Sequence, residues 1–168
     1  LRSDRRVAQK ILSAYLNLLT VYPDQPYDQK RIFYPDSDEP IVEPENIGDT
    51  DTLGEKEQRT LEIVRAAIQN GERALIYTSW VRTDSQQKLK KLLTDEGYRT
   101  EILTDKIKTT DREDWVQKKL AAGMQVLIVN PSLVETGLDL NAFTTLVFYS
   151  MGYKLFTLRQ ASRRSWRI

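Results

Sequence analysis

The 168-residue sequence contains no cysteine and no histidine. Without cysteine there is no disulfide framework and no thiolate ligand for a metal ion. Without histidine the chain lacks the commonest metal ligand and the usual general base, which excludes catalytic triads of the Ser-His or Cys-His kind. No apolar run approaches the roughly 20 residues of a membrane-spanning helix, and the N-terminus shows no apolar signal segment. We therefore expect a soluble, cytoplasmic protein with no membrane partner and no metal ligands of its own.

The composition is that of an ordinary globular protein, with 40% hydrophobic and 29% charged residues. A chain of this length buries roughly two thirds of its unfolded surface, which is enough for a real core. The net charge is only +1, but it is unevenly distributed. Residues 35–55 hold eight acidic and no basic residues, and residues 159–167 hold four arginines and no acid. Because the sequence starts without Met and stops just after these arginines, we expect a piece of a longer protein.

Three segments follow from the pattern of apolar residues. In residues 1–22, apolar side chains recur at helical spacing, which predicts an N-terminal helix. Residues 23–54 contain prolines and acids with neither helical nor strand period, so we expect an acidic linker or surface insertion without regular structure. Residues 55–168 form the third and largest segment.

The third segment begins with a helix, after which short apolar runs alternate with helical stretches. Strands are expected near residues 74–78, 99–103, 125–129 and 145–149. Strands that alternate with helices, with no hairpin signals between them, predict a parallel sheet with right-handed crossovers. The expected fold class is α/β, a three-layer parallel sheet with flanking helices. In such open sheets ligands bind beyond the carboxyl ends of the strands.

Small polar residues follow three of the expected strands. Thr78 and Ser79 follow the first strand, Thr104 follows the second, and Asn130 and Ser132 follow the third. Hydroxyl groups and helix N-terminal amides at strand ends suit the binding of phosphates. Serine and threonine are also good helix N-caps, so the pattern alone leaves both interpretations open.

Two further features lie nearer the C-terminus. Gly137 permits a close backbone approach to a ligand, and Asp139 can accept a hydrogen bond from a ribose hydroxyl or hold an arginine. Arg164 and Arg167 are three residues apart, so on a helix they project from one face and can converge on one anion. The alternative for this pair is a solvated, basic helix end that the helix dipole favours.

Three segments, in order and spacing, resemble motifs four, five and six of the superfamily 2 helicases and translocases. They are residues 74–80, 129–140 and 160–168. The last motif of the Swi/Snf-type branch reads Gln-Ala-x-x-Arg-x-x-Arg-Ile, and Gln160 to Ile168 follow it. The resemblance covers roughly residues 53–168 and implies a RecA-like helicase C-terminal lobe, truncated just after motif six.

The resemblance also implies roles for individual residues. Arg167 would be the arginine finger that reaches the γ-phosphate of ATP, with Arg164 as its companion and Gln160 helping to place both. Gly137 and Asp139 would lie at the nucleotide cleft. Four strand-end residues would contact the nucleic-acid backbone: Thr78, Ser79, Thr104 and Ser132.

The implied cofactors are ATP and Mg²⁺ in the full-length protein. Their main binding site would lie in an N-terminal RecA-like lobe of the same protein, because this sequence has no Gly-x-x-x-x-Gly-Lys-Ser/Thr phosphate loop. The isolated chain is therefore expected to bind no nucleotide and to be inactive. The implied partners are that first lobe and a nucleic acid, expected to be DNA.

Two other functions fit the same strand-helix alternation. One is a non-catalytic α/β interaction module whose arginines are only a basic surface. The other is a nucleotide-sugar or small-molecule transferase lobe. A phosphate loop upstream in the intact protein would favour the motor over both.

Overall fold

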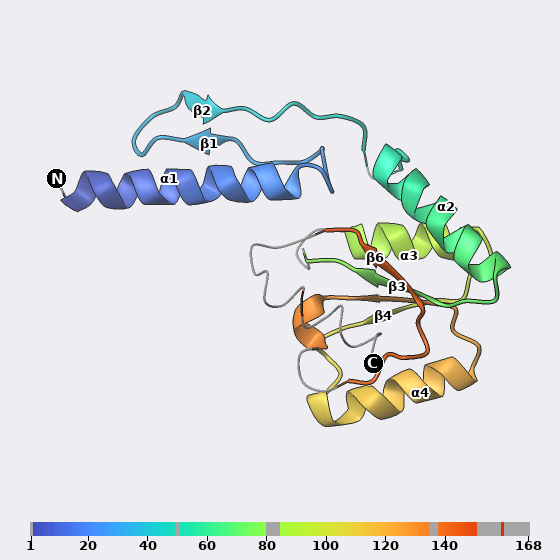
Figure 1. The fold of residues 1–168 in the computed structure, drawn as a ribbon. Coiled ribbons are helices and arrows are strands. Elements are labelled where there is room, and N and C mark those ends of the chain that lie inside the picture. The colour runs from blue at the N-terminus through green and yellow to red at the C-terminus, as the bar shows by residue number, and fades with distance from the viewer. Residues whose placement is uncertain (1, 50, 80–84, 135–137, 151–158, 160–168) are drawn as a thin grey trace. The chain divides into compact units, whose positions relative to one another are not determined.

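The computed structural model describes residues 2–49, 51–79, 85–134, 138–150 and 159. The chain divides into two compact units, Leu1–Thr52 and Leu53–Ile168 (Figure 1). Among the described residues each unit has a sheet of its own, and the two sheets share no strand.

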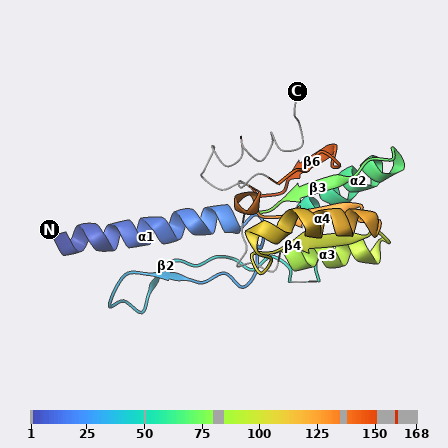
Figure 2. The same cartoon turned by 90° about the horizontal axis from the view of Figure 1, so that it is seen from below.

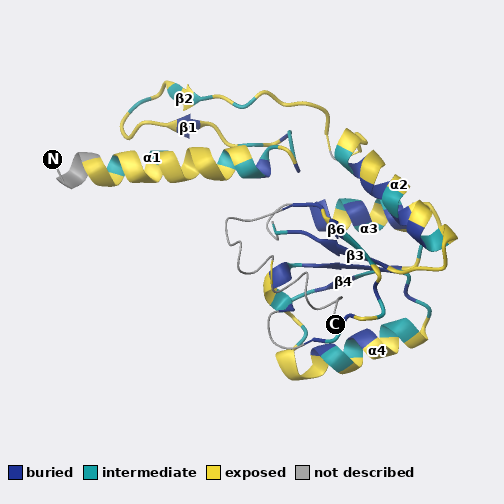
Figure 3. Ribbon diagram, viewed as in Figure 1, coloured by how far each residue is buried: buried dark blue, intermediate teal, exposed yellow. Residues whose placement is uncertain are grey.

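The first unit combines one long helix with a small antiparallel sheet. Helix α1 spans Arg2–Val21, and strands β1 (Ile32–Phe33) and β2 (Pro40–Val42) pair with each other. Val21 and Tyr27 are buried in this unit. Most of α1 is exposed, as Figure 3 shows.

The acidic segment is more ordered than the sequence predicts. It contains β1 and β2, and hydrogen bonds join residues near its beginning to residues near its end. The Tyr22 hydroxyl donates to the Glu45 carbonyl at 2.7 Å, and the Asp28 amide donates to Asn46 Oδ1 at 3.0 Å. These partners are 23 and 18 residues apart. Because both contacts are long-range, periodicity in a short window does not reveal them, and the expectation of no regular structure is wrong.

The second unit is built on a four-stranded sheet in the order β4-β5-β3-β6, with every neighbouring pair parallel. Its elements in chain order are α2 (Glu55–Gln69), β3 (Ala74–Tyr77), α3 (Ser85–Asp95), β4 (Thr100–Leu103), η1 (Thr109–Asp111), α4 (Arg112–Ala121), β5 (Val126–Val129), η2 (Pro131–Leu133) and β6 (Thr145–Phe148). Parallel strands of one sheet need crossover connections. Helix α3 connects β3 to β4, and α4 connects β4 to β5. The predicted parallel sheet is therefore confirmed.

Alternate residues along each strand face opposite sides of the sheet and divide the core in two. On one side Ile76 and Ile128 pack with Val64 of α2 and Leu89 of α3. On the other side Leu75, Tyr77, Leu127 and Val129 pack with Val116 of α4. Figures 1 and 2 show the strands side by side with helices on both faces. The three-layer α/β fold expected from the sequence is confirmed.

Burial on both faces explains why the strands read as continuous apolar runs. All residues of β3 and β5 are buried, as their dark colour in Figure 3 shows. A strand between two helical layers has no polar face, so the alternation typical of a half-solvated strand is missing. No helix in the described part of the chain is both long enough and apolar enough to cross a membrane.

Candidate functional site

The carboxyl ends of all four strands meet at one edge of the sheet. The parallel register places Tyr77 beside Val129 and Phe148, and Val129 beside Leu103. The residues that follow the strands are therefore neighbours, although the chain separates them widely. They include the predicted site residues Thr78, Ser79, Thr104 and Ser132. This is the edge where open α/β sheets bind ligands.

Ser79, Ser132, Ser150 and Asn130 form one hydrogen-bonded network at this edge. The Ser79 amide donates to Ser150 Oγ at 2.8 Å, and the Ser79 hydroxyl donates back to the Ser150 carbonyl at 3.0 Å. Asn130 Nδ2 donates to the Ser79 carbonyl at 3.1 Å. Asn130 Oδ1 accepts from the amide and hydroxyl of Ser132, at 2.9 and 2.7 Å. The network joins the ends of β3, β5 and β6.

Thr78 differs from the other predicted contact residues because its side chain is fully buried. The Thr78 hydroxyl accepts a hydrogen bond from Gln86 Nε2 at 2.6 Å. Gln86 lies in the first turn of α3 and is itself buried. This pair fastens the start of α3 to the end of β3, and it holds the Thr78 hydroxyl away from the surface.

The loop after β4, which contains Thr104, is held to the loop after β5 by Arg112. The Arg112 side chain donates from Nε to the Ile107 carbonyl at 3.2 Å and from a terminal nitrogen to the Leu133 carbonyl at 2.9 Å. Arg112 is buried. A buried guanidinium that bonds two backbone carbonyls positions both loops.

Asp139 is half-buried in the loop between η2 and β6. Its amide donates to the Glu113 carboxylate at 3.0 Å, and its Oδ1 accepts from the Asn141 amide at 3.0 Å. The second bond is a local side-chain turn, which orders the loop by itself. Glu113 lies in the first turn of α4, so the Asp139 loop is anchored to that helix.

Four predicted site residues lie outside the described part of the chain. They are Gly137, Gln160, Arg164 and Arg167. Arg159, the residue directly before Gln160, is described and is exposed. The nucleotide-facing roles of these four residues therefore remain predictions.

Sequence reasoning missed the residues that hold this edge together. Asn130 was recognised only by its place after a strand, although Asn before Pro is a common start for a helical turn. Gln86, Arg112 and Ser150 had no comparable signal. Their partners are 8, 21 and 71 residues away in the chain, and only the fold brings them together.

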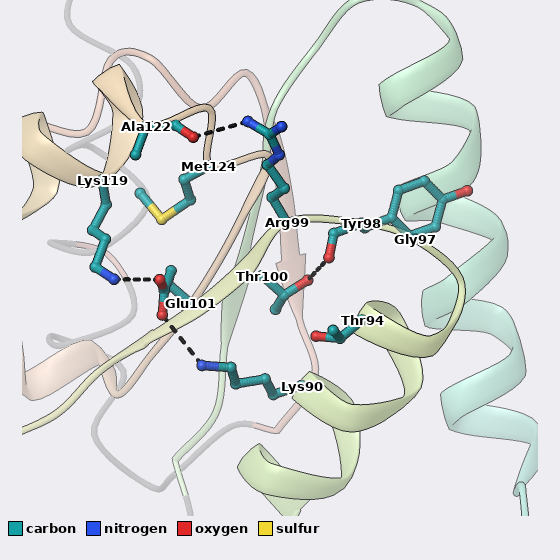
Figure 4. A pocket seen from close by; sticks show the side chains of 10 residues that line it. All are labelled: Lys90, Thr94, Gly97, Tyr98, Arg99, Thr100, Glu101, Lys119, Ala122 and Met124. Atoms are coloured by element: carbon teal, nitrogen blue, oxygen red, sulfur yellow. Dashed lines mark hydrogen bonds and ion pairs between the residues drawn. The ribbon is translucent and has the colours of Figure 1, made fainter.

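A separate cavity of about 370 Å³ lies at the amino ends of β4 and β5 (Figure 4). Lys90 of α3 and Lys119 of α4 both reach the Glu101 carboxylate on β4. Arg99 donates to the Ala122 carbonyl at 2.9 Å. β4 is an edge strand of the sheet, and charged side chains beside an edge strand discourage pairing with another chain. The charges around this cavity therefore oppose pairing of β4 with a strand of another chain.

The two lysines change the acidity of Glu101. Burial raises the pKa of Glu101, but hydrogen bonds from Lys119 and Lys90 and the positive charge of both ammonium groups outweigh it. The pKa of this carboxyl therefore lies below the ordinary value of a glutamate.

No cluster of three or more acidic side chains within the described ranges is placed to hold a metal ion.

Comparison with known proteins identifies the fold. No curated protein matches the sequence. Among solved structures, the C-terminal part of the Fun30 ATPase domain is similar at 17% identity and a TM-score of 0.60, over 67% of this chain and 36% of that one. T4 UvsW is similar at 15% identity and a TM-score of 0.51, over 66% of this chain and 22% of that one. The chain thus spans about a third or less of the structures it resembles.

The family match is more extensive. Residues 55–168 match the family described as "Helicase conserved C-terminal domain". The match covers the parallel sheet, its flanking helices and the polar strand ends described above. The chain therefore belongs to the Helicase conserved C-terminal domain family over residues 55–168, and its parallel sheet with flanking helices has the RecA-like fold of that domain.

Proposed function

We propose that this chain is the second motor lobe of an ATP-dependent helicase or DNA translocase of the Swi/Snf type. The observation that carries the proposal is the sheet edge where Ser79, Asn130, Ser132 and Ser150 form one network beside the loop that contains Thr104. The family match supports a role in a helicase. The domain arrangement that goes with this function is a helix at 1–22, an insertion at 23–54 and the lobe at 55–168.

In this function the strand ends hold nucleic acid by its phosphates. Ser79, Thr104 and Ser132 are the proposed backbone contacts. We assign Thr78 a positioning role at the same edge, because a buried hydroxyl cannot touch a ligand there. Contacts to phosphates carry no sequence information, so binding should be tolerant of sequence and sensitive to salt.

The nucleotide side of the proposal rests on the arginine-rich segment. Arg167 is the proposed finger, Arg164 its companion, and Gln160 a polar group that places them. Gly137 and Asp139 would line the same cleft and respond to the nucleotide. ATP supplies the phosphoryl group that is cleaved, and Mg²⁺ and the phosphates would be held mainly by the first lobe. The part of this lobe is to stabilise the charge on the transferred phosphoryl group.

The test is ATP hydrolysis by the full-length protein with and without DNA. Arg167→Ala should lower kcat by about 10³-fold or more, the effect typical of an arginine finger. Arg167→Lys should not restore activity, because a point charge does not reproduce the planar guanidinium fork. Unchanged hydrolysis in Arg167→Ala would contradict the finger. Absence of DNA-stimulated hydrolysis in the unaltered protein would favour the interaction module.

A further inference from the structure

A buried carboxylate lies at the start of α2, close to the end of β6. Glu57 is 5% exposed, and Tyr149, which directly follows β6, is 4% exposed. The Tyr149 hydroxyl donates to Glu57 Oε1 at 2.9 Å. Lys88 of α3 places its ammonium group 3.5 Å from the same oxygen. Three elements of the lobe therefore converge on one carboxylate.

The surroundings of Glu57 are shaped to hold this charge. A buried carboxylate costs several kcal/mol unless it is paired and hydrogen-bonded. Here the Tyr149 hydroxyl supplies the hydrogen bond and the Lys88 ammonium group supplies the opposite charge. The neighbouring residue Gly54 has no side chain, and a Cβ there would lie 2.6 Å from Glu57 Oε2. The ammonium group of Lys56 lies 4.4 Å from the centre of the Tyr149 ring, which is within range of a cation–π interaction.

Tyr149 connects this carboxylate to the polar edge of the sheet. The amides of Tyr149 and Ser150 both donate to the Tyr77 carbonyl, at 3.0 and 3.3 Å. Ser150 in turn holds Ser79 through its hydroxyl and its carbonyl. A continuous path of hydrogen bonds and one peptide bond therefore runs from Glu57 to Ser79.

Residues 149 and 150 directly follow β6 and precede the segment 151–168, which carries the proposed arginines. Nothing in the proposed chemistry uses Glu57, and an apolar residue would fill the same position at lower cost in desolvation. The contacts of Glu57 act on the point where the chain leaves the sheet.

We propose that Glu57 is a positioning residue that ties the start of α2 to the end of β6 and so sets the place from which the arginine-bearing segment leaves the sheet. This rests on the proposed function of the lobe as a motor. Loosening the contact should displace groups that act in the transition state. A displacement of about 1 Å can cost about 10²-fold in rate, and such a loss appears in kcat more than in KM.

The experiment compares Glu57→Gln and Tyr149→Phe in the full-length protein. Tyr149→Phe removes only the hydroxyl, and Glu57→Gln keeps the shape of the side chain but removes its charge. Each should lower kcat for ATP about 10- to 100-fold with little change in KM. Amide hydrogen exchange at Ser79 and Ser150 should become at least about tenfold faster in both variants.

Two control variants separate positioning from stability. Glu62→Gln changes an exposed glutamate of the same helix, which pairs with exposed Arg59, and should leave both readouts unchanged. Val116→Ala removes volume from a fully buried site of α4 in the hydrophobic cluster on the other side of the sheet, which lowers stability outside the cluster that contains Tyr149. It should leave kcat near that of the unaltered protein at a temperature where all variants are folded.

The outcomes are distinguishable. Unchanged kcat and unchanged exchange in Tyr149→Phe would overturn the proposal, as would an equal loss in Val116→Ala. If Glu57→Gln fails to fold, Tyr149→Phe decides the question alone. If the unaltered protein does not hydrolyse ATP, the proposed function fails, and the exchange rates at Ser79 and Ser150 still support or overturn the positioning role of Glu57.

Discussion

The hydroxyl groups at the sheet edge differ in whether they already take part in hydrogen bonds within the protein. The hydroxyls of Ser79 and Ser132 donate to Ser150 and Asn130, and the Thr78 hydroxyl is buried against Gln86. Thr104 is half-buried, and its hydroxyl makes no hydrogen bond to another described residue. A serine whose only donor is engaged must give up an internal bond before it donates to a phosphate. Thr104 is therefore best placed to contact a ligand without cost to the fold.

Substitution of these residues should separate binding from stability. Ser79→Ala should lower the free energy of unfolding by about 1–2 kcal/mol, because the Ser150 carbonyl loses its donor. Thr104→Ala should change stability by less than about 0.5 kcal/mol and still weaken DNA binding. Urea denaturation and DNA titrations at two salt concentrations measure both quantities. A large stability loss in Thr104→Ala, with unchanged DNA affinity, would reverse this assignment.

The end of α4 shows how one element depends on a single backbone position. Gly123 follows the helix with φ +87°, and the Arg99 guanidinium occupies the space where a Cβ would lie. Arg99 reaches there to donate to the carbonyl of Ala122, the residue that directly follows α4. Gly71, after α2, has φ +77° but no heavy atom within 4 Å of a Cβ built there. The two glycines share a backbone conformation but differ in the space available for a side chain.

Alanine at these two glycines should therefore have unequal effects. Gly71→Ala should destabilise the lobe by about 1 kcal/mol, the cost of a left-handed conformation for an L-residue. Gly123→Ala should cost about 1 kcal/mol more, because Arg99 must move and leave its carbonyl. Thermal or urea unfolding of both variants gives the difference. Equal losses would show that the contact with Arg99 contributes nothing.

The stability that Glu101 on the edge strand β4 contributes depends on pH. Because the pKa of Glu101 is lowered in the folded protein, its stabilising contribution is full above the ordinary pKa of a glutamate. The contribution is lost as the pH falls through the folded pKa. Glu101→Gln should be less stable than the unaltered protein by about 1 kcal/mol at pH 7, since two partly exposed lysines are involved.

The same comparison at pH 3 provides the check. A larger share of the Glu101 carboxyl is protonated at pH 3 than at pH 7, so the difference between the two unfolding free energies should be smaller at pH 3. Urea denaturation of both proteins at pH 7 and pH 3 measures this. A difference that stays constant between the two values would show that the amide disturbs packing rather than charge.

At the scale of the whole molecule, the two units differ in what stabilises them. Both hydrophobic clusters of the sheet consist of residues between Leu61 and Tyr149, all within the second unit. Burial of such side chains contributes about 1.5–3 kcal/mol each. In the first unit, α1 keeps large apolar side chains exposed, among them Leu12, Leu16 and Leu19.

Residues 53–168 should therefore fold without residues 1–52. We expect this fragment to unfold cooperatively, with a Tm within about 5 °C of that of the complete chain. Calorimetry of both proteins tests the expectation, with circular dichroism as the check on helix content. A fragment that fails to fold would show that residues 1–52 contribute to the core of the lobe.

The sequence by itself determined the fold class and the location of the polar residues. Buried parallel strands are short, apolar and separated by helical stretches, and each of these properties is local. In a parallel sheet all carboxyl ends lie at one edge, so the sequence alone is sufficient to predict that Ser79, Thr104 and Ser132 lie at the same edge. Residue identities in order also identified the helicase family, since its motifs are short and contiguous.

Only the tertiary structure decided the strand order and the state of each polar group. Thr78 and Ser79 look alike in sequence, yet one hydroxyl is buried against Gln86 and the other is bonded to Ser150. In the sequence Glu57 looks like any acidic residue in the first turn of a helix. Its hydrogen-bond partner Tyr149 is 92 residues away. A hydrogen bond depends on the positions of two atoms in space, and positions that distant in the chain become neighbours only when the sheet has assembled.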